Sequence, residues 1–223
     1  RQWETSETAS IEGEFHIRQW TRTVRPLRHV PIYLAAVGPK ALDLAGSVAS
    51  GVFFNMLATP DYLGPAIGRV RAAAIAAGRD ANSLRFIANP AVFVTEDIEA
   101  VLRARKRFVA SVLALPGMDV LLENPELDSP AIMRNVRAAM KTSEILARGG
   151  AFADFSREGD IEQAVAAIPD AMVLRGSAVG PLDQVRERIR AFAAVGITDI
   201  VLDRHGLPPE AGQIHRLLES LRE

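Results

Sequence analysis

The sequence contains no cysteine among its 223 residues. This absence excludes disulfide bonds, zinc sites built from thiolates and catalysis by a cysteine nucleophile, and it fits the reducing environment of the cytoplasm. The chain also lacks any apolar run close to the roughly 20 residues of a membrane-spanning helix. Its opening stretch, RQWETSETAS, has no apolar segment of the kind found in a secretory signal peptide. We therefore expect a cytoplasmic protein that does not contact a membrane.

Net charge is nearly absent as well, because 26 lysines and arginines are balanced by 27 aspartates and glutamates. A chain with this balance has no overall field that would attract nucleic acid. One dense basic run, RARKR at 103–107, has no interleaved aromatic residues on which bases could stack. A solvated helix face is its simpler interpretation, and we expect no nucleic-acid partner.

Several catalytic and metal-binding motifs are missing. The chain contains no GxSxG, Walker or GxGxxG sequence. The histidines are scattered and have no spacing typical of metal ligands, so we expect no metal site. They are His16, His29, His205 and His215.

What the chain does contain is a repeated alternation of apolar strands and helices. Hydrophobic residues make up 48% of the sequence, enough for a sizeable core. Their spacing predicts strands at 31–37, 52–57, 84–94 and 197–203, the third being interrupted at Pro90, and helices at 39–50, 60–77, 97–115 and 181–195. Strands that alternate with helices of this length are typical of an α/β fold with a parallel sheet.

The organisation predicted from this pattern is a single domain over residues 1–223 with a helical insertion at about 116–168. Four strands followed by helices correspond to half of an eight-stranded barrel. The chain also begins at Arg1 instead of a methionine. We therefore expect further N-terminal strands outside this sequence.

The order of the segments resembles the luciferase-like monooxygenase superfamily, and within it the F420-dependent oxidoreductases. The resemblance rests on VPIYLAAVGPKALDLAGSVASGVFFN, a helix that starts at Thr-Pro and ends in AAGRD, and AMVLRGSAVGPLDQVRERIRAFAAVGITDIVL. An upstream segment, SIEGEFHI, resembles the hairpin that precedes this unit in the family. The similarity covers residues 7–203, with one departure at Ser50, where family members usually carry aspartate.

The resemblance implies a luciferase-like (β/α)8 TIM barrel, of which about the C-terminal half to two-thirds is present. It also implies that the segment Ala35, Ala36, Val37 and Gly38 lies against the ring and ribityl chain of a flavin or deazaflavin. Small residues let a planar ring approach the backbone, and we expect Gly38 to permit a turn that a side chain would obstruct. Gly38 and Pro39 would open a helix whose free N–H groups favour an anion. A plain strand-to-helix turn is the alternative.

Two further residues are expected near the phosphate of the cofactor. The family places a polar residue at the position of Asn55, and the alternative is an asparagine that bonds the next loop. Some relatives have a lysine where this chain has Ala58, so Arg175 is the best replacement cation, because its planar fork can grip phosphate. A solvated or ion-paired surface arginine is the alternative.

The function implied by the resemblance is hydride transfer between coenzyme F420 and a small organic substrate. An FMN-dependent luciferase-like monooxygenase is one alternative, and a non-catalytic deazaflavin-binding or truncated structural relative is another. The family's acid and base residues come from strands upstream, so the catalytic residues stay unassigned here. A homodimer is expected, because dimers are common in the family.

Overall fold

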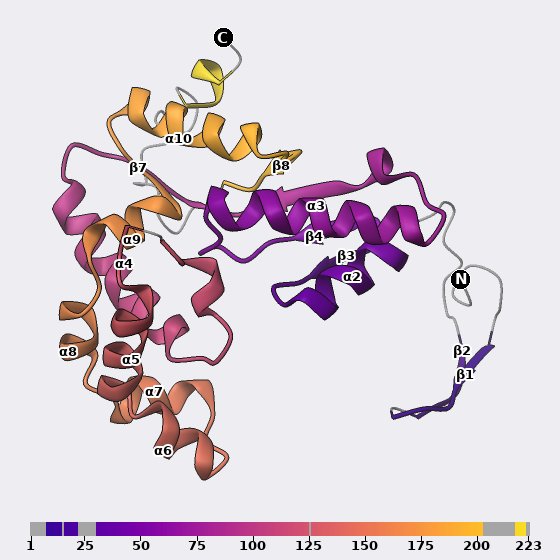
Figure 1. Cartoon of the computed structure of the whole chain (residues 1–223), viewed down its shortest axis with the longest axis horizontal. Helices are drawn as coiled ribbons and strands as arrows, with labels where there is room; N and C mark the ends of the chain where they lie inside the picture. Colours follow the sequence, from indigo (N-terminus) through magenta and orange to yellow (C-terminus); the bar gives the residue numbers. More distant parts are fainter. Residues whose placement is uncertain (1–7, 15, 22–29, 125, 203–216, 222–223) are drawn as a thin grey trace. The chain divides into compact units, whose positions relative to one another are not determined.

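The computed structural model describes residues 8–14, 16–21, 30–124, 126–202 and 217–221. The chain divides into two compact units, one formed by residues 1–32 and the other by residues 33–223 (Figure 1).

The first unit contains a β-hairpin. Its strands are β1 (Thr8–Ile11) and β2 (Ile17–Thr21), which pair antiparallel with Ile11 opposite Ile17. The pairing confirms the hairpin expected at SIEGEFHI. A bulge interrupts its register, where Gln19 has a φ of 49° and its N–H donates to the Ser10 hydroxyl at 3.2 Å.

The second unit is built on a parallel sheet with the strand order β3-β4-β5-β8. These strands are β3 (Tyr33–Ala35), β4 (Gly51–Phe53), β5 (Arg85–Ala88) and β8 (Asp199–Ile200). A row across the sheet runs from Leu34 through Val52 to Phe86, and the last two of these side chains are fully buried. The parallel pairing confirms the predicted α/β class.

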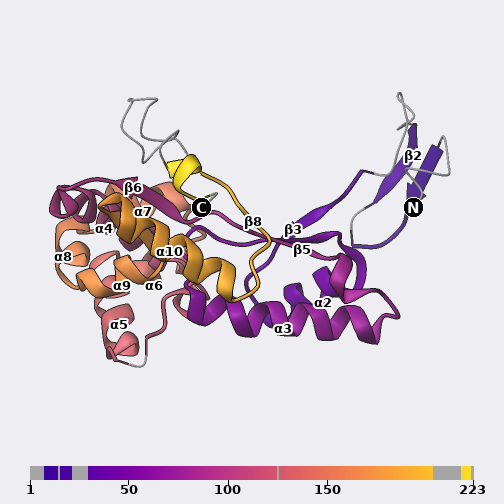
Figure 2. The same ribbon diagram turned by 90° about the horizontal axis from the view of Figure 1, so that it is seen from above.

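Two helices pack on this sheet and on each other, α2 (Pro39–Val48) and α3 (Pro60–Ala76). Figure 2 shows them along the same side of the strands. Gly46 allows their close approach, since a Cβ at that position would lie 2.3 Å from the carbonyl oxygen of Val70. The Thr59 hydroxyl accepts from the Tyr62 N–H at the start of α3, as expected for an N-cap followed by proline.

The strands are shorter than predicted, since β3 covers 33–35 instead of 31–37 and β8 covers 199–200 instead of 197–203. The second strand ends at Phe53 instead of residue 57, because the chain turns at Asn55. The interruption predicted at Pro90 is confirmed, since β5 ends at Ala88 and the chain continues as β6 (Ala91–Val94), but β6 belongs to another sheet. There β6 pairs in parallel with β7 (Ser177–Gly180), a strand that the sequence analysis did not predict.

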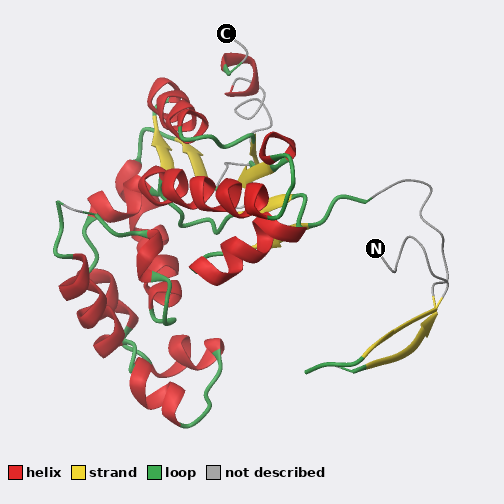
Figure 3. Ribbon diagram, turned by 45° about the vertical axis from the view of Figure 1, so that its right-hand side comes forward, coloured by secondary structure: helices red, strands yellow, loops and turns green. Residues whose placement is uncertain are grey.

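Helices make up most of the segment between β6 and β7 (Figure 3). In order they are α4 (Ile98–Leu113), η2 (Asp119–Leu121), α5 (Ser129–Ala139), α6 (Thr142–Ala147), α7 (Phe152–Glu158), α8 (Ile161–Ala166) and α9 (Asp170–Arg175). The short turn η1 (Ala81–Ser83) precedes β5, and α10 (Leu182–Ala194) follows β7. One large core joins the β3-β4-β5-β8 sheet, α2 and α3 to these helices, and a smaller one lies between β6, β7 and α10.

An ion pair at the amino ends of β5 and β8 joins two strands that are far apart in the sequence. Arg85 Nε donates to Asp199 Oδ2 at 2.8 Å, and a second nitrogen of the same guanidinium contacts the other carboxylate oxygen. The Thr198 hydroxyl also donates to Asp199 Oδ2 at 2.7 Å. The hydrogen bond from Arg85, followed by that from Thr198, holds the pKa of Asp199 below its ordinary value of 3.8.

This ion pair predicts a pH-dependent contribution to stability. The pKa of Asp199 is lowered in the folded state, so the contribution is present above about pH 4 and is lost as the pH falls through the folded pKa. We expect Asp199→Asn to lower the melting temperature at pH 7 by a few degrees at most, because both partners are partly exposed. Thermal unfolding followed by circular dichroism at pH 7 and pH 3 measures this difference. An undiminished difference at pH 3 would contradict the assignment.

Candidate functional site

The segment predicted to contact a cofactor follows the carboxyl end of β3 and leads into α2. Ala35 and Gly38 are exposed, Val37 is half-buried and Ala36 is buried. In parallel α/β folds, ligands bind at the carboxyl ends of the strands. The predicted segment therefore lies at the edge of the sheet where a ligand would bind.

Gly38 does not have the role expected from the sequence. Its φ of −76° and ψ of 158° are extended values that any residue adopts, so the prediction of a turn that requires glycine is wrong. A Cβ placed on Gly38 would meet no atom within 4 Å. The glycine leaves open space beside the backbone, and nothing in the described part of the chain fills it.

The amino terminus of α2 differs in its capping from those of α3, α4 and α5. Gly38 is the N-cap and Pro39 follows it, with no capping side chain and no acidic residue in the first turn. By contrast, side chains cap α3, α4 and α5, through Thr59, Asp97 and Asp128. The first turn of α2 therefore keeps the partial positive charge of a helix amino terminus without a carboxylate to offset it.

Tyr62 fixes the predicted cofactor segment to α3. Its hydroxyl donates to the carbonyl oxygen of Val37 at 2.6 Å, and its ring packs edge-on against Phe54 with centroids 6.4 Å apart. Burial raises the pKa of Tyr62 from 10.0 to about 12. The phenol is therefore a neutral hydrogen-bond donor at physiological pH. Through it, α3 holds the loop that contains Val37.

Asn55 lies just past β4 and bonds the chain that follows it. Its Oδ1 accepts from the Leu57 N–H at 2.9 Å, and its carbonyl oxygen accepts from the Ala58 N–H at 3.0 Å. These bonds match the alternative interpretation, in which the asparagine bonds the next loop. The amide nitrogen of Asn55 has no hydrogen-bond partner among the described residues and stays available to a ligand.

Arg175 ends α9, so the apolar residues that precede it belong to a helix. Its Nε donates to Asp61 Oδ2 at 3.1 Å, and another of its nitrogens lies 3.8 Å from a carboxylate oxygen of Glu126. The guanidinium is therefore ion-paired, as in the alternative interpretation of Arg175 as an ion-paired surface arginine. An anion bound to Arg175 would compete with Asp61.

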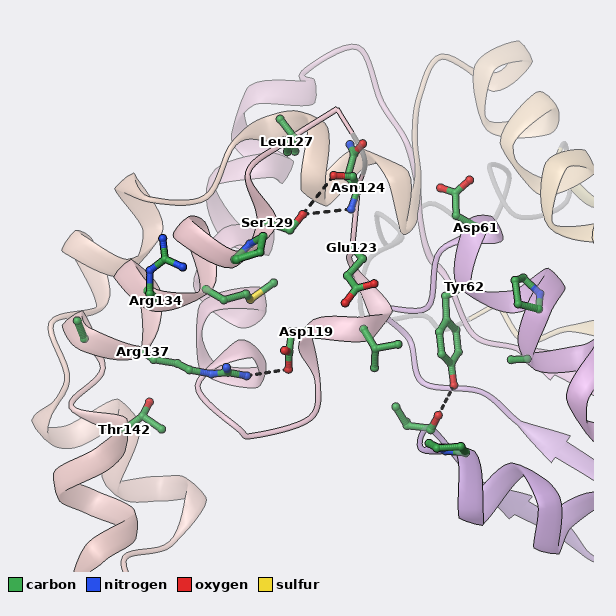
Figure 4. Close-up of a pocket in the computed structure, with 18 of the residues that line it drawn as sticks. Asp61, Tyr62, Asp119, Glu123, Asn124, Leu127, Ser129, Arg134, Arg137 and Thr142 are labelled. Atoms are coloured by element: carbon green, nitrogen blue, oxygen red, sulfur yellow. Dashed lines mark hydrogen bonds and ion pairs between the residues drawn. The ribbon is translucent and has the colours of Figure 1, made fainter.

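A cavity of about 1290 Å³ opens beside this segment (Figure 4). One wall comes from the start of α2 and the first half of α3, including Val37, Pro39, Tyr62 and Arg69. The opposite wall comes from η2 and the loop after it, α5 and the start of α6. Of the predicted residues only Val37 lines the cavity, and Asp61, the partner of Arg175, lines it as well.

Two arginines of the lining are paired with carboxylates. Arg69 grips Asp43 through two hydrogen bonds of 2.7 and 2.6 Å, and Arg137 donates to Asp119 at 2.8 Å. Burial raises the pKa of Asp119, but the hydrogen bond and charge of Arg137, together with backbone hydrogen bonds, lower it further, so the net pKa is below 3.8. Asp119 therefore stays ionised, and its pair with Arg137 is held at neutral pH.

Most of the residues that line the cavity are not marked by any motif in the sequence. Tyr62 stands three residues after the predicted N-cap, with nothing in the local pattern to mark its contact with Val37. The lining residues of η2, α5 and α6 come from the helical insertion, whose packing is not encoded in any local motif. Among the described residues no cluster of three metal-ligating side chains occurs, while His29, His205 and His215 lie outside the described residues. No described helix is long and apolar enough to span a membrane.

Comparison with known proteins identifies relatives of this chain. A model of the family described as luciferase-like monooxygenase matches residues 1–199. The 5,10-methylenetetrahydromethanopterin reductase of Methanolobus tindarius is 31% identical over 172 residues, which are 77% of this chain and 47% of that protein. A putative coenzyme F420-dependent oxidoreductase of Mycobacterium tuberculosis is 26% identical over 81% of this chain and 50% of that protein. The chain spans about half the length of the curated relatives it matches.

Two solved structures share the fold. The coenzyme F420 dependent tetrahydromethanopterin reductase from Methanopyrus kandleri superposes with a TM-score of 0.68 at 22% identity, over 97% of this chain and 58% of that one. An F420-dependent secondary alcohol dehydrogenase in complex with an F420-acetone adduct gives a TM-score of 0.65 at 16% identity, over 100% of this chain and 58% of that one. These likenesses confirm the predicted fold class.

The environment of Tyr62 predicts an alkaline loss of stability. The folded pKa of about 12 lies above the ordinary value of 10.0, so the contribution of the neutral phenol is lost as the pH rises from about 10 towards 12. We expect Tyr62→Phe to cost about 1 kcal/mol at pH 7, because it leaves the Val37 carbonyl without its donor. Urea unfolding measures the cost, and absorbance titration of a Tyr33→Phe variant measures the pKa. Titration of Tyr62 near 10 would contradict the buried hydrogen bond.

Proposed function

Because this chain belongs to the luciferase-like monooxygenase family, whose model matches residues 1–199, we propose that it is part of an oxidoreductase that uses coenzyme F420. The names of its relatives support this cofactor, since the oxidoreductase of Mycobacterium tuberculosis and both superposed structures are described as F420-dependent. The proposed reaction is hydride transfer to or from a small organic substrate. An FMN-dependent reaction is the alternative, supported by a structural likeness to the riboflavin lyase RcaE, which is described with a modified FMN and has a TM-score of 0.51.

The open space at Gly38 is the observation that carries the proposal. Glycine is not required there by the backbone or by packing within the described chain, and the segment borders a cavity large enough for a cofactor. A planar ring could lie against Ala35, Ala36, Val37 and Gly38, because none of them has a large side chain on that side. The uncapped start of α2 would favour the negative charge of a phosphate.

Asn55 and Arg175 complete the proposed cofactor-binding set. Asn55 would donate from its amide nitrogen, since its oxygen is already bonded to Leu57. Arg175 would contribute positive charge next to Asp61, with which the bound anion would share it. Both roles depend on the cofactor extending along the carboxyl edge of the sheet past β4.

Coenzyme F420, when bound, would supply the hydride, and the chain would orient it and limit access of water. Tyr62 would hold the Val37 carbonyl so that the loop keeps its shape against the cofactor. Apolar side chains of the lining, Leu42, Pro65 and Met133, would exclude water from part of the cavity. Since the chain spans about half of its relatives, we propose that the whole reaction also needs residues of the barrel that lie outside this chain.

Fluorescence titration of the purified chain with F420 tests the cofactor assignment. We expect saturable binding that excess FMN does not displace. Gly38→Leu should weaken binding at least tenfold, because the new side chain fills the space proposed for the ring while the extended backbone accepts any residue. Circular dichroism should show an unchanged fold.

Gly68→Leu is the matched control. Gly68 is exposed on α3, and a Cβ there also meets no atom within 4 Å, but Gly68 does not line the cavity. Binding by this variant should equal that of the parent chain. Preferential binding of FMN would favour the alternative, and equal weakening by both substitutions would refute the placement at Gly38.

We also propose a cytoplasmic homodimer with a small-molecule substrate. The small-molecule assignment is supported by the relatives, one described with methylenetetrahydromethanopterin in its name and one with an F420-acetone adduct. The dimer is supported only by the family resemblance, and the location by the lack of cysteine. Size-exclusion chromatography with light scattering should give twice the mass of one chain, and a single-chain mass at all concentrations would refute the dimer.

A further inference from the structure

Asn89 lies between two strands and carries an amide oxygen without a partner. It follows β5 directly and precedes Pro90, after which the chain continues as β6. Its Oδ1 atom is buried and has no hydrogen-bond partner among the described residues, although the residue as a whole is half-buried. A buried oxygen that accepts no hydrogen bond lowers the stability of the folded chain, and such atoms are rare in native proteins. The cost indicates that the amide serves something other than the fold.

Two other asparagines show what a structural role requires. The Oδ1 atoms of Asn55 and Asn124 each accept from the backbone N–H two residues later, at 2.9 and 2.8 Å. Both side chains therefore close a local turn, which is a common use of asparagine. Asn89 closes no such turn within the described chain, and Pro90, which follows it, has no N–H to donate. Local structure therefore does not account for an asparagine at this position.

The alternation of side chains along β5 places Asn89 on the face of the sheet opposite to α2 and α3. Phe86 and Ala88 are buried in the core that contains these two helices, whereas Arg85 and Ile87 are not part of it. The strand pairing continues to its end, since the Ala88 carbonyl still accepts a hydrogen bond from β8's side at 2.8 Å. A residue before proline is also extended. Successive side chains of a strand point to opposite faces, so Asn89 follows Arg85 and Ile87.

An apolar row on that face leads across the sheet to Asn89. Ala35, Phe53 and Ile87 stand in register on β3, β4 and β5. Ala35 is exposed, Phe53 is 36% exposed and Ile87 is half-buried, although parallel sheets are normally covered on both faces. Three adjacent strands span about 10 Å, and the row begins in the segment for which we propose contact with a cofactor. Asn89 lies two residues beyond Ile87, at the β5 end of this row.

We propose that the amide nitrogen of Asn89 donates to a carbonyl oxygen on the edge of the cofactor ring, with the ring lying on the row Ala35, Phe53 and Ile87. The inference rests on the proposed function in one respect, which is that a planar ring with carbonyl groups binds at this edge of the sheet. Flavins and deazaflavins both carry such carbonyl groups. The nitrogen of Asn89 is not among the buried unpartnered atoms, so a ligand can reach it. Asparagine is then kept for binding, at a cost to the fold.

Asn89→Leu tests the proposal, because leucine has a similar shape and no polar atom. Binding of F420, and of lumiflavin as a ring without the ribityl tail, should each weaken about tenfold in fluorescence titrations, as expected for the loss of one hydrogen bond. The melting temperature of the variant should equal or exceed that of the parent chain, since the variant removes a buried oxygen that has no partner. Replacement of a purely structural asparagine would instead lower the melting temperature and leave binding unchanged.

Infrared spectroscopy of the bound ring reports the hydrogen bond itself. A hydrogen bond lowers the stretching frequency of a carbonyl group, so one ring carbonyl should absorb at higher frequency in the Asn89→Leu complex than in the parent complex. Asn135→Leu is the matched control for all of these measurements. Asn135 is exposed on α5 and lies outside the lining of the cavity, so binding by this variant should stay within twofold of the parent chain.

Unchanged binding by Asn89→Leu, or equal weakening by Asn135→Leu, would overturn the proposal. Absence of both F420 and lumiflavin binding in the parent chain would overturn it together with the proposed function. The two failures are otherwise separable. F420 binding that does not depend on Asn89 would refute this inference alone, whereas lumiflavin binding that depends on Asn89, without binding of F420, would support the inference and refute the F420 assignment.

Discussion

Parallel pairing of β3, β4, β5 and β8 places the carboxyl ends of all four strands on one edge of the sheet. Each connection must then return along the sheet, which α2 and α3 do on the same side. Because the strands are short, the loops after β3 and β4 begin at the sheet edge and stay close to it. The segment Ala35–Gly38, for which we propose cofactor binding, and the turn at Asn55 are therefore neighbours, because they follow adjacent parallel strands.

Close packing of α2 on α3 positions the loop before α2 at the wall of the cavity. Gly46 lets the two helices approach, and Tyr62 then reaches back from α3 to the carbonyl of Val37. The loop before α2 is held by a hydrogen bond from a helix that follows it in the chain, instead of by its own turn geometry. Gly38 can therefore have an extended backbone that any residue adopts, while the space beside it stays open.

The helical insertion supplies the other wall, and ion pairs fix it in place. Arg137 joins α5 to η2 through Asp119, and Arg175 joins α9 to the first turn of α3 through Asp61. Both pairs connect segments that are distant in the sequence. Arg134 lies on α5 and Lys141 comes between α5 and α6, and both residues line the cavity.

The sequence alone determined the α/β class, the positions of α2, α3 and α10, and the family to which the chain belongs. It could do so because periodicity, caps at Thr59 and Pro60, and the order of the segments are local properties. It also located the segment at Ala35–Gly38, since a strand followed by small residues and a helix start is readable from adjacent positions. It indicated the interruption at Pro90, but it did not predict that β6 belongs to another sheet or that β7 pairs with it, because the partner of each strand is chosen by pairing across the fold.

Only the tertiary structure decided which side chains surround the cavity. Tyr62 bonds a residue 25 positions earlier, Arg175 pairs with one 114 positions earlier, and Arg134 and Lys141 line the cavity from an insertion with no motif of its own. Such contacts depend on how helices pack, and packing is satisfied by many sequences of similar apolar pattern. The local sequence therefore determined where the sheet ends and the helices begin, and long-range packing determined which charges meet there.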